Sequence, residues 1–192
     1  MKQTYAFLIA IFYCILGNAQ VVDIPDADFK NKLLNDPQTI DLNGDGEIDV
    51  EEAALVTNLT FSYCDFDNII GIQAFANLRS LTFGSYMTID SPIDLSGMTS
   101  LESLRFTKCS FSTANLAGLT NLESLSVGYG GDIDFLNIDD LVNLKTISLY
   151  ETHISALDLT NCSSLKTFIA QETDLDTLIL DGLTNLESFK LR

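Results

Sequence analysis

The chain has 192 residues, and 27 acidic side chains against 10 basic ones give it a formal net charge of −17 at pH 7. A field of this sign repels the phosphates of nucleic acids and the surfaces of anionic lipids, so both are excluded as partners. A chain of this length is enough for one domain with its own core.

Residues 1–19 have the pattern of a signal peptide. Lys2 gives a positive start, residues 5–16 form an uncharged and mostly apolar run, and the small residues that follow permit cleavage after Ala19. The run is shorter than the roughly 20 apolar residues that a membrane-spanning helix needs. We therefore expect an exported protein, either secreted or on the cell surface, with no transmembrane segment after signal cleavage.

Residues 20–55 are predicted to form an N-terminal cap. Asp26 is a suitable helix-capping residue, and Phe29 and Leu33 lie one helical turn apart, so both can face a core. Pro37 ends this helical segment before an acidic stretch begins.

Residues 41–52 match a twelve-residue calcium loop. Oxygen-bearing side chains occupy positions 1, 3, 5, 9 and 12, position 6 is a glycine where the chain must turn, and position 7 offers its backbone carbonyl. The predicted Ca²⁺ ligands are Asp41, Asn43, Asp45, Glu47 through its carbonyl, Asp49 and Glu52 through both carboxylate oxygens. The alternative is a solvated acidic turn. Because the sequence has no second such loop and no continuous entering helix, we expect a structural ion rather than a calcium switch.

A repeated hexapeptide with the pattern apolar-x-x-apolar-x-apolar dominates residues 56–192. Seven copies begin at residues 56, 78, 101, 122, 144, 165 and 186, so the spacing is 21 to 23 residues. The alternation within each copy predicts a short strand with one buried face. A second apolar cluster recurs between the hexapeptides, for example at Leu157 and Leu159, and is predicted to cover the opposite side.

These repeats resemble the leucine-rich repeat family, whose units of 20–29 residues begin with the same pattern. The resemblance covers residues 56–192, about seven units with the last one truncated. It implies an α/β solenoid with parallel strands on a concave face. Together with the preceding calcium loop, the repeats are similar to a group of secreted bacterial leucine-rich repeat proteins. In that group the loop belongs to a short helical N-terminal cap, which shields the first repeat.

Three cysteines, Cys64, Cys109 and Cys162, follow the predicted signal peptide. Cys64 and Cys109 occupy the same column of the repeat but lie two units apart. That separation is about 10 Å, beyond the Cα distance of about 7 Å that a disulfide allows. We expect buried, free thiols.

The sequence offers little that could support catalysis. His153 is the only histidine, and its place just after the fifth predicted strand indicates a surface loop. Close pairs of carboxylates are expected by chance among so many acidic residues. We therefore expect a protein that is not an enzyme, with a hydrolase as the minor alternative.

The concave face is predicted to be a binding surface. Small hydroxyl side chains fill its outward columns, and larger side chains suited to anchoring a protein or stacking on a sugar lie among and beside them. These are Tyr63, Arg105, Lys108, Tyr129 and Tyr150. The alternative is that serine and threonine are simply good exposed strand residues.

The expected function is an exported binding module that recognises an extracellular protein or glycan. A structural repeat segment of a larger cell-surface adhesin is the alternative. It is suggested by a chain that stops at Arg192, directly after a predicted strand.

Overall fold

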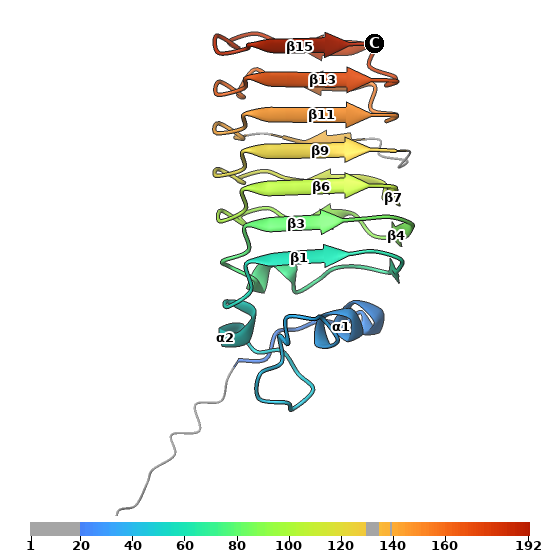
Figure 1. Cartoon of the computed structure of the whole chain (residues 1–192), viewed down its shortest axis with the longest axis vertical. Coiled ribbons are helices and arrows are strands. Elements are labelled where there is room, and N and C mark those ends of the chain that lie inside the picture. The colour runs from blue at the N-terminus through green and yellow to red at the C-terminus, as the bar shows by residue number, and fades with distance from the viewer. Residues whose placement is uncertain (1–19, 130–134, 139) are drawn as a thin grey trace, which may run out of the picture.

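The computed structural model describes residues 20–129, 135–138 and 140–192, and its main feature is a sheet of seven parallel strands. In spatial order these strands are β1 (Asn58–Phe61), β3 (Ser80–Phe83), β6 (Ser103–Thr107), β9 (Ser124–Gly128), β11 (Thr146–Tyr150), β13 (Thr167–Gln171) and β15 (Ser188–Leu191). Figure 1 shows them stacked one above another along the long axis. Sequence order equals spatial order, so the seven predicted hexapeptides lie side by side, as expected.

The apolar alternation of the hexapeptides fixes how these strands pair. In β1, Leu59 and Phe61 are buried while Asn58 and Thr60 are exposed. Leu59 pairs with Leu81 of β3, and Phe61 pairs with its equivalent phenylalanine in the same strand. A slip of one residue would turn every buried side chain toward solvent, so the pattern allows only this register.

Short strands build the other sides of the solenoid. One sheet contains β2 (Asp65–Phe66), β4 (Met87–Ile89) and β7 (Cys109–Ser110). A second contains β5 (Ile93–Asp94), β8 (Thr113–Asn115) and β10 (Phe135–Asn137), and a third contains β12 (Ala156–Asp158) and β14 (Thr177–Ile179). Within the described residues, the repeats contain one 3₁₀ turn, η1 (Ile72–Ala74), and no α-helix. In the described residues the expected α/β solenoid is therefore corrected to a β-solenoid, and both α-helices lie in the cap.

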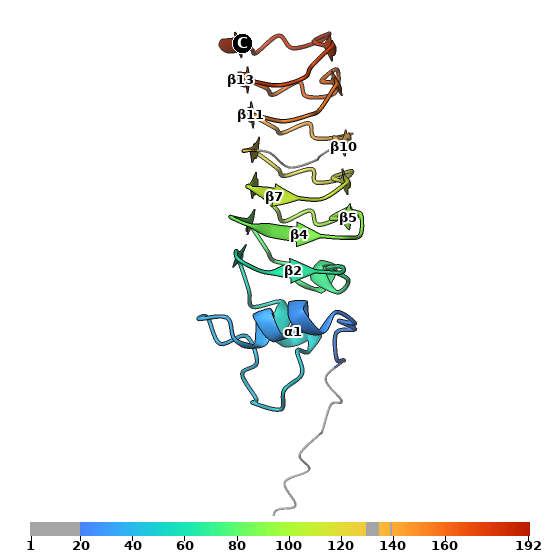
Figure 2. The same ribbon diagram turned by 90° about the vertical axis from the view of Figure 1, so that its right-hand side faces the viewer.

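The stack is nearly straight, as Figures 1 and 2 show. Curvature arises when one side of each turn is wider than the other, as when helices about 10 Å across oppose strands about 4.8 Å apart. Here strands line both sides, so both advance by similar steps per turn. The face of the seven-stranded sheet, expected to be concave, is accordingly close to flat.

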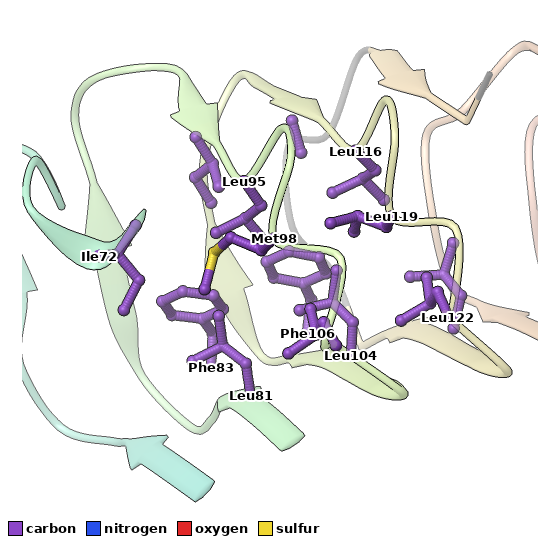
Figure 3. Close-up of a cluster of buried hydrophobic side chains, with 14 of the residues drawn as sticks. Ile72, Leu81, Phe83, Leu95, Met98, Leu104, Phe106, Leu116, Leu119 and Leu122 are labelled. Atoms are coloured by element: carbon purple, nitrogen blue, oxygen red, sulfur yellow. The ribbon is translucent and has the colours of Figure 1, made fainter. Parts of the chain in front are cut away.

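Apolar side chains from all sides of each turn fill one continuous core. Phenylalanines stack through its lower turns, with ring centroids 5.8 Å apart for Phe61 and Phe83 and 5.2 Å apart for Phe83 and Phe106. Figure 3 shows Phe83 and Phe106 packed beside Met98 and leucines of neighbouring turns. Each turn therefore buries its apolar face only with the help of the turns beside it.

Asparagine side chains join successive turns just before the main strands. In four turns, the side-chain amide donates to a backbone carbonyl of the preceding turn or, in the first case, of the cap, each time at 2.8 Å. The donors are Asn77, Asn121, Asn143 and Asn185. These bonds satisfy carbonyls that the turn leaves without a partner in the sheet.

The cap closes the lower end of the solenoid. It contains the helices α1 (Ala27–Leu34) and α2 (Val50–Ala53). Phe29 of α1 is fully buried, with its ring centroid 5.5 Å from that of Phe61 and 5.3 Å from that of Phe66. The predicted cap residue Asp26 accepts a hydrogen bond from the Phe29 N–H at 2.7 Å. The helical cap is thus packed directly against the first turn.

The three cysteines of the described chain are free, as expected. Cys109 and Cys162 are buried, but Cys64 is only partly buried, which corrects the expectation for that residue. Its position beside the cap, where the solenoid core ends, explains the difference. The predicted signal peptide, residues 1–19, lies outside the described residues. Among those that are described, no helix is long and apolar enough to cross a membrane.

Candidate functional sites

The loop of residues 41–52 is held by hydrogen bonds between its own side chains and backbone. Asp41 accepts from the N–H of Gly44 at 2.7 Å and from the N–H of Gly46 at 3.0 Å. Gly46 has a φ of 82°, a conformation that glycine adopts at little cost. The chain therefore turns at loop position 6, as the calcium-loop pattern requires.

Positions 3 and 5 of the loop form similar turns. Asn43 accepts from the N–H of Asp45 at 2.8 Å, and Asp45 accepts from the N–H of Glu47 at 2.9 Å. In such turns the backbone folds around the side-chain oxygen two residues earlier. The oxygens of these successive positions are thus fixed relative to one another.

Glu52 connects the two ends of the loop. The residue is only 6% exposed, and its carboxylate accepts from the N–H groups of Leu42 at 2.8 Å, Asn43 at 3.2 Å and Asp49 at 3.1 Å. Asp49 in turn accepts from the Glu52 N–H at 2.8 Å, which completes a capping box at the start of α2. No cationic side chain of the described residues pairs with this buried carboxylate.

The loop is anchored to the rest of the cap. Ile48 is fully buried, and its carbonyl accepts from the Val22 N–H at 2.8 Å. The side chain of Glu47 forms an ion pair with Lys30 of α1. Glu47 therefore has its carboxylate engaged elsewhere, which agrees with a role for its carbonyl at loop position 7.

The donor chemistry of this loop suits a hard divalent cation, because all six predicted ligands offer oxygen. In the described part of the chain, no group of three or more histidine, cysteine or acidic side chains is gathered closely enough to hold a metal ion. Two of the six predicted ligands are of other kinds, namely the amide oxygen of Asn43 and the backbone carbonyl of Glu47. Calcium binding stays a prediction.

A line of surface side chains follows the ends of the first five main strands; four of them lie just beyond their strand and are exposed, and the fifth, Tyr150, is the half-buried last residue of β11. We call it the tyrosine ladder, and its members are Tyr63, Tyr86, Lys108, Tyr129 and Tyr150. Tyr63 is 74% exposed, Tyr86 68% and Tyr129 50%. The four tyrosines of the ladder are the only tyrosines of residues 20–192.

Neighbouring members of the ladder contact one another. The ring centroids of Tyr63 and Tyr86 lie 5.8 Å apart in a stacked arrangement, and those of Tyr129 and Tyr150 lie 4.9 Å apart. The Lys108 ammonium sits between the two pairs, 5.8 Å from the Tyr86 centroid and 5.7 Å from the Tyr129 centroid. At such distances a cation is attracted to the ring faces, so the ladder is one connected surface.

Four of the five residues predicted for partner binding belong to this ladder, and one does not. Arg105 lies on the sheet face, between Thr82 and Ser126 of the neighbouring strands. Tyr86 was missed, because a constant offset from the strand places Ser85 in this column. The turn of β3 has one extra residue at the corner, and the spacing of 23 residues to the next hexapeptide was the available signal.

Gly84 lies just before the corner that contains the extra residue. A Cβ at Gly84 would lie 2.4 Å from the hydroxyl oxygen of Ser62 and 3.2 Å from the carbonyl oxygen of Phe61. The Gly84 N–H donates to that carbonyl at 2.7 Å, so the two turns approach more closely than a side chain permits.

Acidic residues continue the ladder at its upper end. The hydroxyl of Tyr150 donates to the carboxylate of Glu172 at 3.1 Å. This hydrogen bond, with the nearby negative charge, raises the pKa of Tyr150 above its ordinary value. The ladder therefore changes along its length from an aromatic and basic surface to an acidic one.

His153 lies on the surface, as predicted. Its Nδ1 is 2.7 Å from a carboxylate oxygen of Asp174, and both side chains are exposed. A histidine–carboxylate pair of this kind resembles the orienting part of a catalytic triad, but catalysis also needs a nucleophile and an enclosed site.

Comparison with known proteins identifies no family for this chain. No protein-family model and no curated protein matches it. Among solved structures, the chain is similar to a crystal structure of an internalin from Listeria monocytogenes, with 14% sequence identity and a TM-score of 0.35. The similarity covers 92% of this chain and 79% of that one. A similarity with so low a TM-score does not establish the fold. The fold assignment rests on the strand register described above.

Proposed function

We propose that this chain is an exported, non-enzymatic binding module that uses the tyrosine ladder and the adjoining sheet face to bind an extracellular protein. The observation that carries the proposal is the ladder itself. All four tyrosines of residues 20–192 lie in one line at the surface, three of them exposed and Tyr150 half-buried, although buried tyrosines are common in protein cores. Large, rigid aromatic side chains in an exposed cluster are typical of binding surfaces.

The geometry of the ladder favours a protein over a glycan. A sugar ring stacks on an open aromatic face. Here Tyr63 and Tyr86 stack on each other, and Lys108 covers faces of Tyr86 and Tyr129. Apart from the Tyr63 ring, which stacks on one side only, the ladder therefore presents mainly ring edges, hydroxyl groups and one ammonium. Such groups suit the mixed polar and apolar surface of a protein partner.

Export and calcium binding are parts of the same proposal. The charge and hydropathy pattern of residues 1–19 supports export through a signal peptide. The turns that fix Asp41, Asn43 and Asp45, together with the buried carboxylate of Glu52, support one Ca²⁺ in the loop. When bound, the ion would supply positive charge that holds these oxygens together and stabilises the cap.

An array of extracellular proteins and glycans, probed with the wild-type protein, tests the binding proposal. We expect at least one protein on the array to bind, and Tyr86→Ala combined with Tyr129→Ala to abolish that binding. Val142→Ala, which also shortens an exposed apolar side chain, is the matched control and should bind normally. The proposal fails if no protein binds, or if the double variant binds as well as the control.

Scanning calorimetry with and without Ca²⁺ tests the loop. Extracellular calcium modules bind with a Kd of about 10⁻⁴–10⁻³ M. With a Kd of about 10⁻⁴ M, free Ca²⁺ at a hundredfold excess over Kd would raise the free energy of unfolding by about 2.7 kcal/mol. Asp45→Ala should remove the rise in Tm, whereas Asp181→Ala, an exposed acid far from the cap, should keep it. An equal rise in both variants would place the ion elsewhere on this acidic surface.

A further inference from the structure

A groove of about 840 Å³ lies between the cap helix α1 and the end of the first main strand, β1. Asp28, Asn31 and Lys32 line it from the helix side, and Thr60 and Tyr63 line it from the strand side. Of its lining residues, the tyrosine ladder of the proposed function includes only Tyr63.

The outer edge of β1 is only partly covered. Backbone groups in a strand alternate between its two edges. The carbonyls of Thr57 and Phe61 accept from N–H groups of the β3 turn, at 2.8 Å and 2.7 Å. The alternate residues Asn58, Thr60 and Ser62 therefore direct their N–H and C=O groups away from β3, toward the cap.

Side chains of the cap cover both ends of this edge and leave its middle open. The amide of Gln38 donates to the Asn58 carbonyl at 2.8 Å, and the Lys32 ammonium approaches the Ser62 carbonyl at 3.4 Å. Among the described residues, none bonds to the N–H or the C=O of Thr60 on that side. An exposed edge of this kind is a template for pairing with another strand.

The walls of the groove are acidic and partly aromatic. Its lining includes the carboxylates of Asp28, Asp36 and Asp65 against the single ammonium of Lys32. In the described structure, the carboxylate of Asp28 has no hydrogen-bond or ion-pair partner. Tyr63 adds an exposed ring at one end. Such a surface complements a positively charged partner, since carboxylates and aromatic faces both attract cations.

We propose that this groove binds an extended, basic segment of a protein partner by strand addition to β1. The main chain of the segment pairs with the open N–H and C=O of Thr60. Its lysine or arginine side chains lie against Asp28 and Tyr63. Lys32 swings aside when the segment enters, because its contact with Ser62 is long and its side chain is exposed. This is strand addition of the kind that other peptide-binding domains use.

The groove is a second site, which shares only Tyr63 with the tyrosine ladder. A negative binding result for the groove would therefore leave the proposed role of the ladder unaffected. A negative result for the ladder would likewise leave the groove proposal unaffected. The two sites are separated by variants that touch one and not the other.

Three synthetic peptides test the proposal by fluorescence anisotropy. The probe is an eight-residue peptide of alternating lysine and valine. The first control has the same sequence and charge but carries N-methyl groups on alternate residues, which blocks main-chain pairing. The second replaces lysine by glutamate. We expect the probe to bind, the methylated peptide to bind at least tenfold more weakly, and the acidic peptide not to bind. Absence of probe binding, or equal binding of the methylated peptide, overturns the proposal.

Two protein variants locate the binding. Thr60→Pro removes the outward N–H without removing a bond to β3, and proline is tolerated on edge strands. We expect it to weaken probe binding at least tenfold with an unchanged circular dichroism spectrum. Asp28→Asn should weaken binding severalfold, whereas Asp181→Asn should not. Unchanged binding in Thr60→Pro overturns the proposal, and if that variant does not fold, the methylated peptide still decides.

The rate of cysteine alkylation shows where on the protein the peptide binds, which an affinity alone does not show. Cys64 lines the groove and is partly exposed, whereas Cys109 and Cys162 are buried. Alkylation mapped by mass spectrometry should therefore modify Cys64 first. We expect the bound probe peptide to slow that reaction at least severalfold, and the acidic peptide to leave it unchanged. An unchanged rate with the probe at saturation would place the peptide elsewhere.

Discussion

Replacement of Asp26 by alanine tests whether one carboxylate joins the cap to the repeats. Asp26 is 7% exposed. One of its oxygens caps α1 through the Phe29 N–H, and the other accepts from the N–H groups of Asp67 at 2.6 Å and Asn68 at 3.1 Å. The side chain thus bonds two segments 41 residues apart in sequence.

The expected loss follows from these three bonds. A helix N-cap contributes about 1 kcal/mol, and a hydrogen bond to a charged group contributes about 1.5 kcal/mol or more. We therefore expect Asp26→Ala to lower the free energy of unfolding by about 4 kcal/mol. Asp26→Asn, which keeps one acceptor oxygen, should lose roughly half of that.

Urea unfolding followed by circular dichroism measures the change, with the slope against urea as a check that the same surface unfolds. Asp28→Ala is the matched control, because this exposed neighbour on the same helix makes no such bonds and should cost less than about 1 kcal/mol. A loss below about 1 kcal/mol in Asp26→Ala, equal to the control, would refute the junction role.

Three further predictions concern the repeats. Phe83→Ala should cost about 3–5 kcal/mol in urea unfolding, because it empties a fully buried position between two stacked rings; a loss below 1 kcal/mol would contradict the packing. Glu151 has a φ of 49°, so Glu151→Gly should stabilise the fold by about 0.5–1 kcal/mol, whereas Ser148→Gly within β11 should destabilise it by a similar amount; changes of the same sign would count against this. Burial raises the pKa of Cys109 to about 12 and that of Cys162 to about 11. Above pH 9 the unfolded chain releases thiol protons that the folded chain keeps, so the free energy of unfolding should fall by roughly 1.4 kcal/mol per pH unit for each thiol. Cys162→Ala should show a shallower fall, and an identical pH profile would disprove the assignment.

The main sheet could be predicted from sequence because its signal is redundant. Each hexapeptide has two inward apolar residues in period two, as Leu59 and Phe61 show in β1. That pattern fixes both the strand and its register. Seven copies at nearly constant spacing then determine the order of the strands.

The opposite sides could not be predicted in the same way. Strands such as β2 and β7 have only two residues each, too few to show an alternation. Curvature also escaped prediction, because it depends on the relative widths of two sides and the hexapeptides describe only one. The helices expected from the family resemblance are replaced here by these short strands.

Some features of the candidate sites could be predicted from the sequence, and others could not. The cap residue Asp26 and the turn at Gly46 follow from local chemistry, and the structure has both where they were predicted. Tyr86 was missed because a single extra residue shifts one column, and a fixed offset cannot detect such a shift. The groove beside β1 depends on the packing of α1 against a distant strand, which no local pattern specifies.

The extra residue in the turn of β3 shows how this architecture separates display from support. The added length is taken up at a corner next to Gly84, while β3 keeps its register with both neighbouring strands. Insertions at one corner can therefore change the side chains displayed there during evolution, while the register and stacking of the turns stay the same.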